Sequence, residues 1–175
     1  MALKNSLSEY GVLAKFFHWT LFILIVIMLI VGFVMSDITN KFLKYEIVNL
    51  HKLLGLIILV LMTLRLAWAM SNPKPLLTTF WEKTVAKIVH QSLYILLILM
   101  PLTGWIMSTA HGKPPTWLGW KIKLPLQTNQ NVAQLFATYH NKLAIMIILL
   151  LSLHILAALY HHIIKKDHIL RRMLP

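Results

Sequence analysis

Histidine is the residue type in this chain with the greatest capacity for chemistry. Nine histidines occur among 175 residues, although 58% of the chain is hydrophobic. Ionisable side chains in so apolar a sequence are costly and usually serve a function. A single histidine at the end of an apolar segment is more often an interfacial or hydrogen-bonded residue than a ligand. The case for ligation therefore depends on how the histidines are spaced.

Two histidines lie on one apolar segment at a spacing that repeats a helix face. His140 and His154 are 14 residues apart. In an α-helix, 14 residues return to within about 40° of the starting direction and rise ~21 Å. The two imidazoles therefore share one stripe at two depths. Neutral imidazole is a common axial ligand of haem iron, and two haems stacked across a membrane need an offset of about this size.

The same step of 14 residues relates histidines to other residues on three further segments. It leads from His18 to Gly32, from His51 to Arg65 and from His90 to Gly104. Because successive membrane spans alternate in direction, these residues sort into two levels. One level holds Gly32, His51, Gly104 and His140, and the other holds His18, Arg65, His90 and His154.

The level with two histidines and two glycines is the simpler one. His51 and His140 would supply two ligands. Gly32 and Gly104 lack side chains, so a flat group or a neighbouring backbone could come close to them. Two ligands and two gaps predict a haem site, and close helix packing is the alternative explanation for the glycines.

The other level leaves the ligand pair open. His154 is the expected anchor because it shares the stripe with His140, and its partner is either His18 or His90. Arg65 could pair with haem propionates and would favour the reduced state, since a buried cation stabilises added negative charge. The alternative is that Arg65 snorkels from a span end.

One further histidine follows the same stripe. His161 lies seven residues beyond His154, about 10 Å further along the helix axis. An imidazole there could exchange protons with a quinone, which takes up protons where electrons arrive. The alternative is an interfacial histidine beside Lys165 and Lys166.

Four apolar segments must position these residues. They cover about residues 17–35, 53–70, 88–107 and 143–164, and each reaches the ~20 residues that cross a bilayer. The longest connection is expected over about residues 109–139. The sequence predicts an all-α fold, an integral membrane four-helix transmembrane bundle that forms one domain over residues 1–175. Because cysteine is absent, disulfides, iron–sulfur clusters and thiolate metal sites are excluded.

The charge is strongly basic, with 17 lysines and arginines against 5 acidic residues. In a membrane protein this excess indicates loops that fix topology and contact anionic lipid, so we expect lipid and no nucleic acid as a partner. With both termini in the cytoplasm, ten of the basic residues lie on that side and seven on the other. The bias favours this orientation, in which the level of His51 and His140 faces outward.

Several local patterns together resemble the bacterial cytochrome b561 family. The pattern covers residues from about 10 to the end of the chain. Its parts are His18-Trp19, Leu50-His51-Lys52, His154 followed by His161-His162, and the tail Lys166-Asp167-His168-Ile169-Leu170-Arg171-Arg172-Met173.

The resemblance implies a four-helix cytochrome of the bacterial inner membrane with two b-type haems. His18 and His154 would ligate the cytoplasmic-side haem, and His51 and His140 the periplasmic-side haem. His90 would then be a quinone-site or supporting residue. Bacterial relatives are thought to pass electrons between a periplasmic-side donor and membrane ubiquinone, and superoxide oxidation has been assigned to some of them.

We therefore expect an electron-transfer oxidoreductase whose donor at the outer face is a small molecule or a protein. One alternative is a haem-bearing anchor subunit that passes electrons from a partner dehydrogenase or hydrogenase to quinone. A second is a histidine-lined metal or proton transporter, which would need carboxylates within the spans, and none of the five acidic residues falls in those segments. A structural membrane protein with incidental histidines is the third.

Overall fold

Four long helices dominate the computed structural model, which describes residues 2–75 and 80–174. They are α1 (Val12–Val34), α2 (Lys41–Ser71), α3 (Phe80–Ala110) and α4 (Gln130–Tyr160). The 3-10 turn η1 (Met35–Asp37) extends α1, and the π-helical turn η2 (His161–Lys165) extends α4. All four helices are long and apolar enough to cross a membrane. The predicted all-α membrane bundle is confirmed.

The helices run beyond the apolar segments that predicted them. Helix α4 begins at Gln130, so the last third of the expected connection, up to Tyr139, is helical. The side-chain oxygen of Asn129 accepts hydrogen bonds from the backbone N–H groups of the first turn, which sets this start. Glu46 and Glu82 fall within the extensions of α2 and α3. Hydropathy detects only the part of a helix inside the membrane, whereas capping and packing set its ends.

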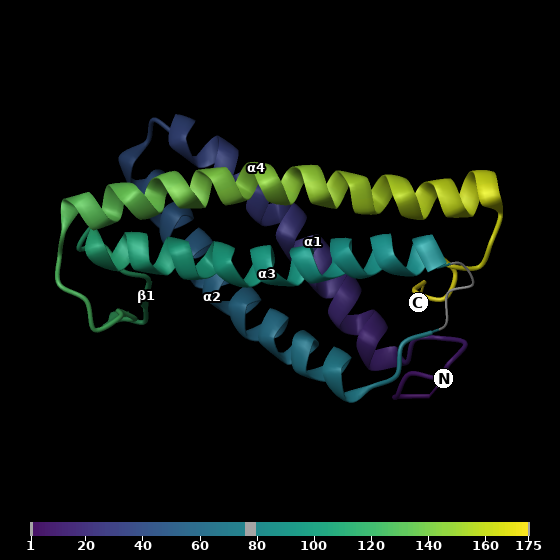
Figure 1. Ribbon diagram of the computed structural model, residues 1–175. Helices are drawn as coiled ribbons and strands as arrows, with labels where there is room; N and C mark the ends of the chain where they lie inside the picture. Colours follow the sequence, from purple (N-terminus) through teal and green to yellow (C-terminus); the bar gives the residue numbers. More distant parts are fainter. Residues whose placement is uncertain (1, 76–79, 175) are drawn as a thin grey trace.

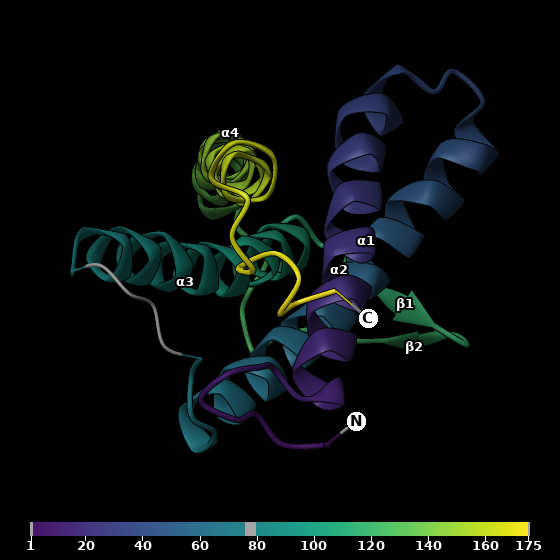
Figure 2. The same cartoon turned by 90° about the vertical axis from the view of Figure 1, so that its right-hand side faces the viewer.

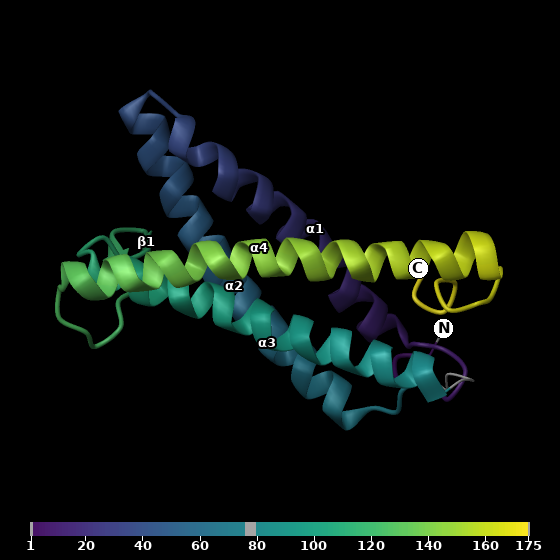
Figure 3. The same cartoon turned by 45° about the horizontal axis from the view of Figure 1, so that its top comes forward.

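The helices pack in chain order, with α1 on α2, α2 on α3 and α3 on α4 (Figure 1). The α1–α2 pair crosses α4 at a large angle (Figure 3). A small core of buried side chains lies where they meet, including Leu21, Ile58, Met62 and Ile147. Many other large apolar side chains are exposed along the helices, as expected of a surface that faces lipid.

The connection from α3 to α4 carries a short hairpin. Strand β1 (Thr116–Trp117) pairs antiparallel with β2 (Trp120–Lys121). At the other end of the bundle the chain terminus folds back onto α1, where Trp19 Nε1 donates to the carbonyl of Met173 at 2.8 Å. A non-helical segment therefore packs beside the helices near each end of the bundle.

Candidate functional site

The structure brings His51 of α2 and His140 of α4 together, and we call them the first pair. Their ring centroids are 6.4 Å apart. Both line an apolar cavity between the helices, together with Gly55, Pro101 and Gly104. The cavity is therefore walled by apolar side chains and contains two imidazoles, a donor set that suits a large flat ligand with a metal centre.

Hydrogen bonds fix the protonation of His140. Thr103 Oγ1 donates its one hydrogen to the carbonyl of Met100 at 2.7 Å, and it lies 3.1 Å from His140 Nδ1. The Met100 carbonyl also lies 3.1 Å from the same nitrogen and can only accept. Nδ1 of His140 must therefore carry the proton, which leaves Nε2 with a free lone pair for a metal.

The two glycines of this level lie against the imidazole rings. A Cβ added at Gly104 would be 3.0 Å from Cε1 of His140, and one at Gly32 would be 3.5 Å from Cε1 of His51. The glycine in α3 therefore leaves the space that the His140 ring occupies. Sequence reasoning reserved this space for a flat ligand or a neighbouring backbone.

The second pair is His18 of α1 and His154 of α4, with ring centroids 6.2 Å apart. His90 of α3 lies closer to the same ring, at 5.4 Å from the centroid of His154. All three imidazoles thus converge at one level, as the step of 14 residues indicated. Within the part of the chain that the structure describes, no group of three or more histidine or acidic side chains is arranged to hold a metal ion directly.

Arg65 of α2 completes this level. Its Nη2 lies 3.0 Å from Nδ1 of His18, and its guanidinium carbon lies 5.5 Å from the ring centroid of Tyr94. Because arginine only donates, Nδ1 of His18 accepts, and the ring proton is on Nε2. If His18 binds a metal through Nε2 as a neutral ring, Arg65 must release Nδ1 and is then free to bind an anionic group.

Comparison with known proteins agrees with these observations. The model of the family described as prokaryotic cytochrome b561 matches residues 9–175. The chain belongs to this family. It is 31% identical over 179 residues to cytochrome b561 homolog 2 of Escherichia coli strain K12, covering 99% of this chain and 95% of the relative. It is 29% identical over 173 residues to the probable superoxide oxidase CybB of Yersinia pestis, covering 96% and 97%.

Family membership confirms the resemblance that the sequence motifs indicated. The chain is a membrane electron-transfer protein, a multi-pass protein of the bacterial inner membrane that is surrounded by lipid. The prokaryotic cytochrome b561 family implies haem b and iron as the cofactor.

The spacing of the imidazoles can be tested against haem. A metal that would be held between two imidazole nitrogens, at about 2 Å from each, needs ring centroids roughly 6 Å apart. The first pair at 6.4 Å and the second pair at 6.2 Å fit this value. The distance of 5.4 Å between His90 and His154 is too short. The spacing of both pairs thus fits a haem b that they would hold between them.

One buried ring nitrogen at the first pair lacks a hydrogen-bond partner. Among the residues that the structure describes, the buried side-chain nitrogens that lack a hydrogen bond are His51 Nδ1 and Trp68 Nε1. A buried polar atom without a partner costs about 1–3 kcal/mol. A group bound in the cavity within reach of His51 Nδ1 would supply the partner that the described residues do not.

His161 contacts a carboxylate, unlike the histidines of the two pairs. It begins η2, and its Nδ1 lies 2.5 Å from Oδ2 of Asp167. Burial alone would raise the pKa of Asp167, but hydrogen bonds from His161 and from the Ile169 N–H outweigh it and lower the pKa below its ordinary 3.8. The carboxylate is thus ionised at neutral pH and accepts a hydrogen bond from the Nδ1–H group of the imidazole.

Sequence reasoning missed two side chains that support the histidines. Thr103 precedes Gly104 on α3 and holds His140, and Tyr94 lies one turn beyond His90 and faces Arg65. The spacing of four residues from His90 could have pointed to Tyr94, because residues at i and i+4 share a helix face. Nothing in the local sequence distinguishes Thr103 from an ordinary membrane threonine.

Proposed function

We propose that the chain is a di-haem cytochrome in which each imidazole pair holds one haem b. The observation that carries the proposal is the presence of two facing imidazole pairs, at 6.4 and 6.2 Å, that share α4. Their α4 members are 14 residues apart, so the two sites would be separated by about 21 Å along the helix axis. Haem supplies reversible one-electron chemistry at iron when it is bound.

Different side chains and backbone groups contact the imidazoles at the two levels. At the first pair, Thr103 and the Met100 carbonyl hold the Nδ1 proton of His140 and orient its ring. At the second pair, the Arg65 cation stabilises added negative charge. An electron is therefore favoured at the level of His18 and His154. His51 with His140, and His18 with His154, would each hold one haem, which would supply one-electron transfer and not the binding of a small ligand.

We infer that the electron acceptor is membrane ubiquinone, bound at the end of the bundle near the second pair. Quinone reduction consumes protons, and His161 with Asp167 forms an imidazole–carboxylate pair at that end of the bundle, suited to deliver them. His90 is a second candidate, since it faces His154 but its distance does not suit ligation. Arg65, once released from His18, would bind a haem propionate.

The electron donor proposed for the first pair is superoxide. The Yersinia relative is described as a probable superoxide oxidase. Lys52 lines the cavity with His51, and its Nζ donates to the carbonyl of Lys113 at 2.8 Å. Lysines here would attract an anion toward the cavity. In this arrangement both termini lie in the cytoplasm and the first pair faces the periplasm.

Haem content tests the core of the proposal. Pyridine haemochrome analysis of the purified protein should give two haems per chain. His140→Ala should lose one haem and leave the other, and His90→Ala should keep two low-spin haems. His111→Ala is the matched control, because this histidine is exposed and bonds only to Gln130 at the surface. One haem per chain in the unmodified protein would contradict the proposal.

Turnover tests the donor and acceptor separately. The isolated chain should reduce a ubiquinone analogue when superoxide is supplied, and His161→Phe should slow this step while both haems still reduce. Haem reduction only by a co-purifying dehydrogenase or hydrogenase would instead favour the anchor-subunit function. Both outcomes leave the haem count unaffected, so the two tests can fail independently.

A further inference from the structure

The hairpin between α3 and α4 ends in an apolar tip that faces away from the protein. Trp117 and Trp120 are paired across β1 and β2. Their exposed fractions are 62% and 80%, and that of Leu118 at the turn is 81%. Large apolar side chains concentrated at so small a tip usually indicate a surface that meets another apolar phase.

The backbone of the tip gives a second indication. Leu118 has φ of 48° and Gly119 has φ of 83°, so both central residues of the two-residue turn are left-handed. Turns of this kind favour asparagine or glycine at the first position, because a leucine side chain is disfavoured there. A leucine at a left-handed position carries local steric strain, so the exposed apolar side chain at the tip is present despite the backbone preference of the turn.

The hairpin is held firmly by the helices. Asn49 of α2 makes two hydrogen bonds with the backbone of Thr116, at 2.8 and 2.9 Å. On the other strand side, Trp105 Nε1 of α3 donates to the carbonyl of Ile122 at 2.9 Å. Pro115, just before β1, is fully buried. The apolar tip is therefore presented by a fixed base.

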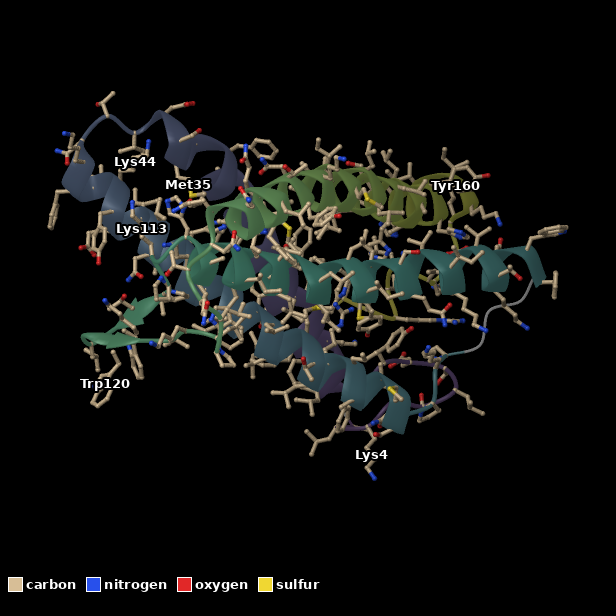
Figure 4. All side chains as sticks on the ribbon, turned by 60° about the vertical axis from the view of Figure 1, so that its left-hand side comes forward. Lys4, Met35, Lys44, Lys113, Trp120 and Tyr160 are labelled. Carbon is tan, nitrogen blue, oxygen red and sulfur yellow. The ribbon has the colours of Figure 1, made fainter. Side chains whose placement is uncertain are left out.

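The position of the hairpin relative to the helix ends indicates its depth in the membrane. It lies beside the ends of α3 and α4 and not beyond them (Figure 1). Seen nearly along α4, it extends sideways past α2 (Figure 2). The Trp120 side chain points away from the ribbon (Figure 4). Because the helices cross the bilayer, a segment extending sideways from their ends lies at the depth of the lipid headgroups.

We propose that this tip is a membrane anchor, in which Trp117, Leu118 and Trp120 insert into the leaflet at the end of the bundle near the first pair. Exposed cations flank the tip at Lys121 and Lys123. They complement anionic lipid headgroups, and indole rings are favoured at the membrane–water interface. The hairpin packs on α2, one of the membrane-spanning helices, so lipid is favoured over a protein partner.

Site-directed spin labelling tests the insertion without reference to haem. The chain contains no cysteine, so Leu118→Cys places a single nitroxide at the tip. Gln127→Cys is the matched control, an exposed position in the same connection. In nanodiscs, the label at 118 should collide several-fold more often with oxygen than with a water-soluble nickel complex. The label at 127 should show the reverse.

A second measurement uses the native side chains. Lipids brominated near the headgroup should quench the fluorescence of the unmodified protein more than that of the variant Trp117→Phe/Trp120→Phe, which lacks both tip tryptophans. This difference should be larger in anionic than in zwitterionic nanodiscs. A label at 118 as accessible to nickel as the label at 127 would overturn the proposal. So would protection of the label from both reagents only when a second protein is added, since that result would indicate a protein partner.

Discussion

Replacing Gly104 with alanine perturbs the first pair by one methyl group. The added Cβ would lie 3.0 Å from Cε1 and 3.3 Å from Nδ1 of His140, where 3.4–4 Å is ordinary contact. The ring must shift by a few tenths of an ångström. It cannot do so freely, because Thr103 and the Met100 carbonyl hold its Nδ1 proton at 3.1 Å.

The effect of Gly104→Ala on haem affinity depends on whether the added methyl group strains the protein with haem bound or without it. Without haem the ring shifts against those Nδ1 hydrogen bonds alone, and this cost is offset by the gain of up to about 1 kcal/mol from alanine in place of glycine in a helix. Bound haem holds the ring in place, so an overpacking cost of about 1–3 kcal/mol falls on haem affinity. We therefore expect haem at the first pair to bind about 5- to 150-fold more weakly, with thermal unfolding of the haem-free protein little changed.

Haem transfer to apomyoglobin measures this affinity, and Gly32→Ala is the control. Its Cβ would lie 3.5 Å from Cε1 of His51, an ordinary contact. In Gly104→Ala one haem should transfer faster and the other at the normal rate, whereas Gly32→Ala should keep the rates of the unmodified protein. Equal losses in both variants, or none in Gly104→Ala, would refute the reasoning.

Three further predictions concern the hydrogen-bonding and charged groups around the sites. Thr103→Val removes one of two acceptors for the His140 Nδ1 proton, so haem retention at the first pair should weaken about 2- to 13-fold in the same transfer assay. Arg65→Gln removes a cation worth about 1–2 kcal/mol at an effective dielectric of about 20, which should lower one midpoint potential by about 40–90 mV in a redox titration. The lowered pKa of Asp167 means that its contact with His161 stabilises the tail above about pH 4 and is lost as the pH falls through that lowered pKa. Limited pepsin digestion of the tail should therefore accelerate only below that pH, and Asp167→Asn should be cleaved readily throughout.

The membrane fold and the two levels of histidines follow from the sequence alone. Four apolar stretches of sufficient length leave few alternatives to four spanning helices, because backbone polar groups in lipid must bond within each helix. The 14-residue step works for a similar reason, since the helical period is a local property of the chain. It placed His51 with His140, and His154 with both His18 and His90, before any packing was known.

The geometry among the three imidazoles depended on tertiary structure. His18 and His90 are equivalent candidates by helical period, yet their centroids lie 6.2 and 5.4 Å from that of His154. The rotation of each helix about its axis and its crossing angle set these distances, and both arise from packing between segments far apart in the chain. The same holds for Thr103 and for the sideways hairpin, whose roles depend on partners that the local sequence does not specify.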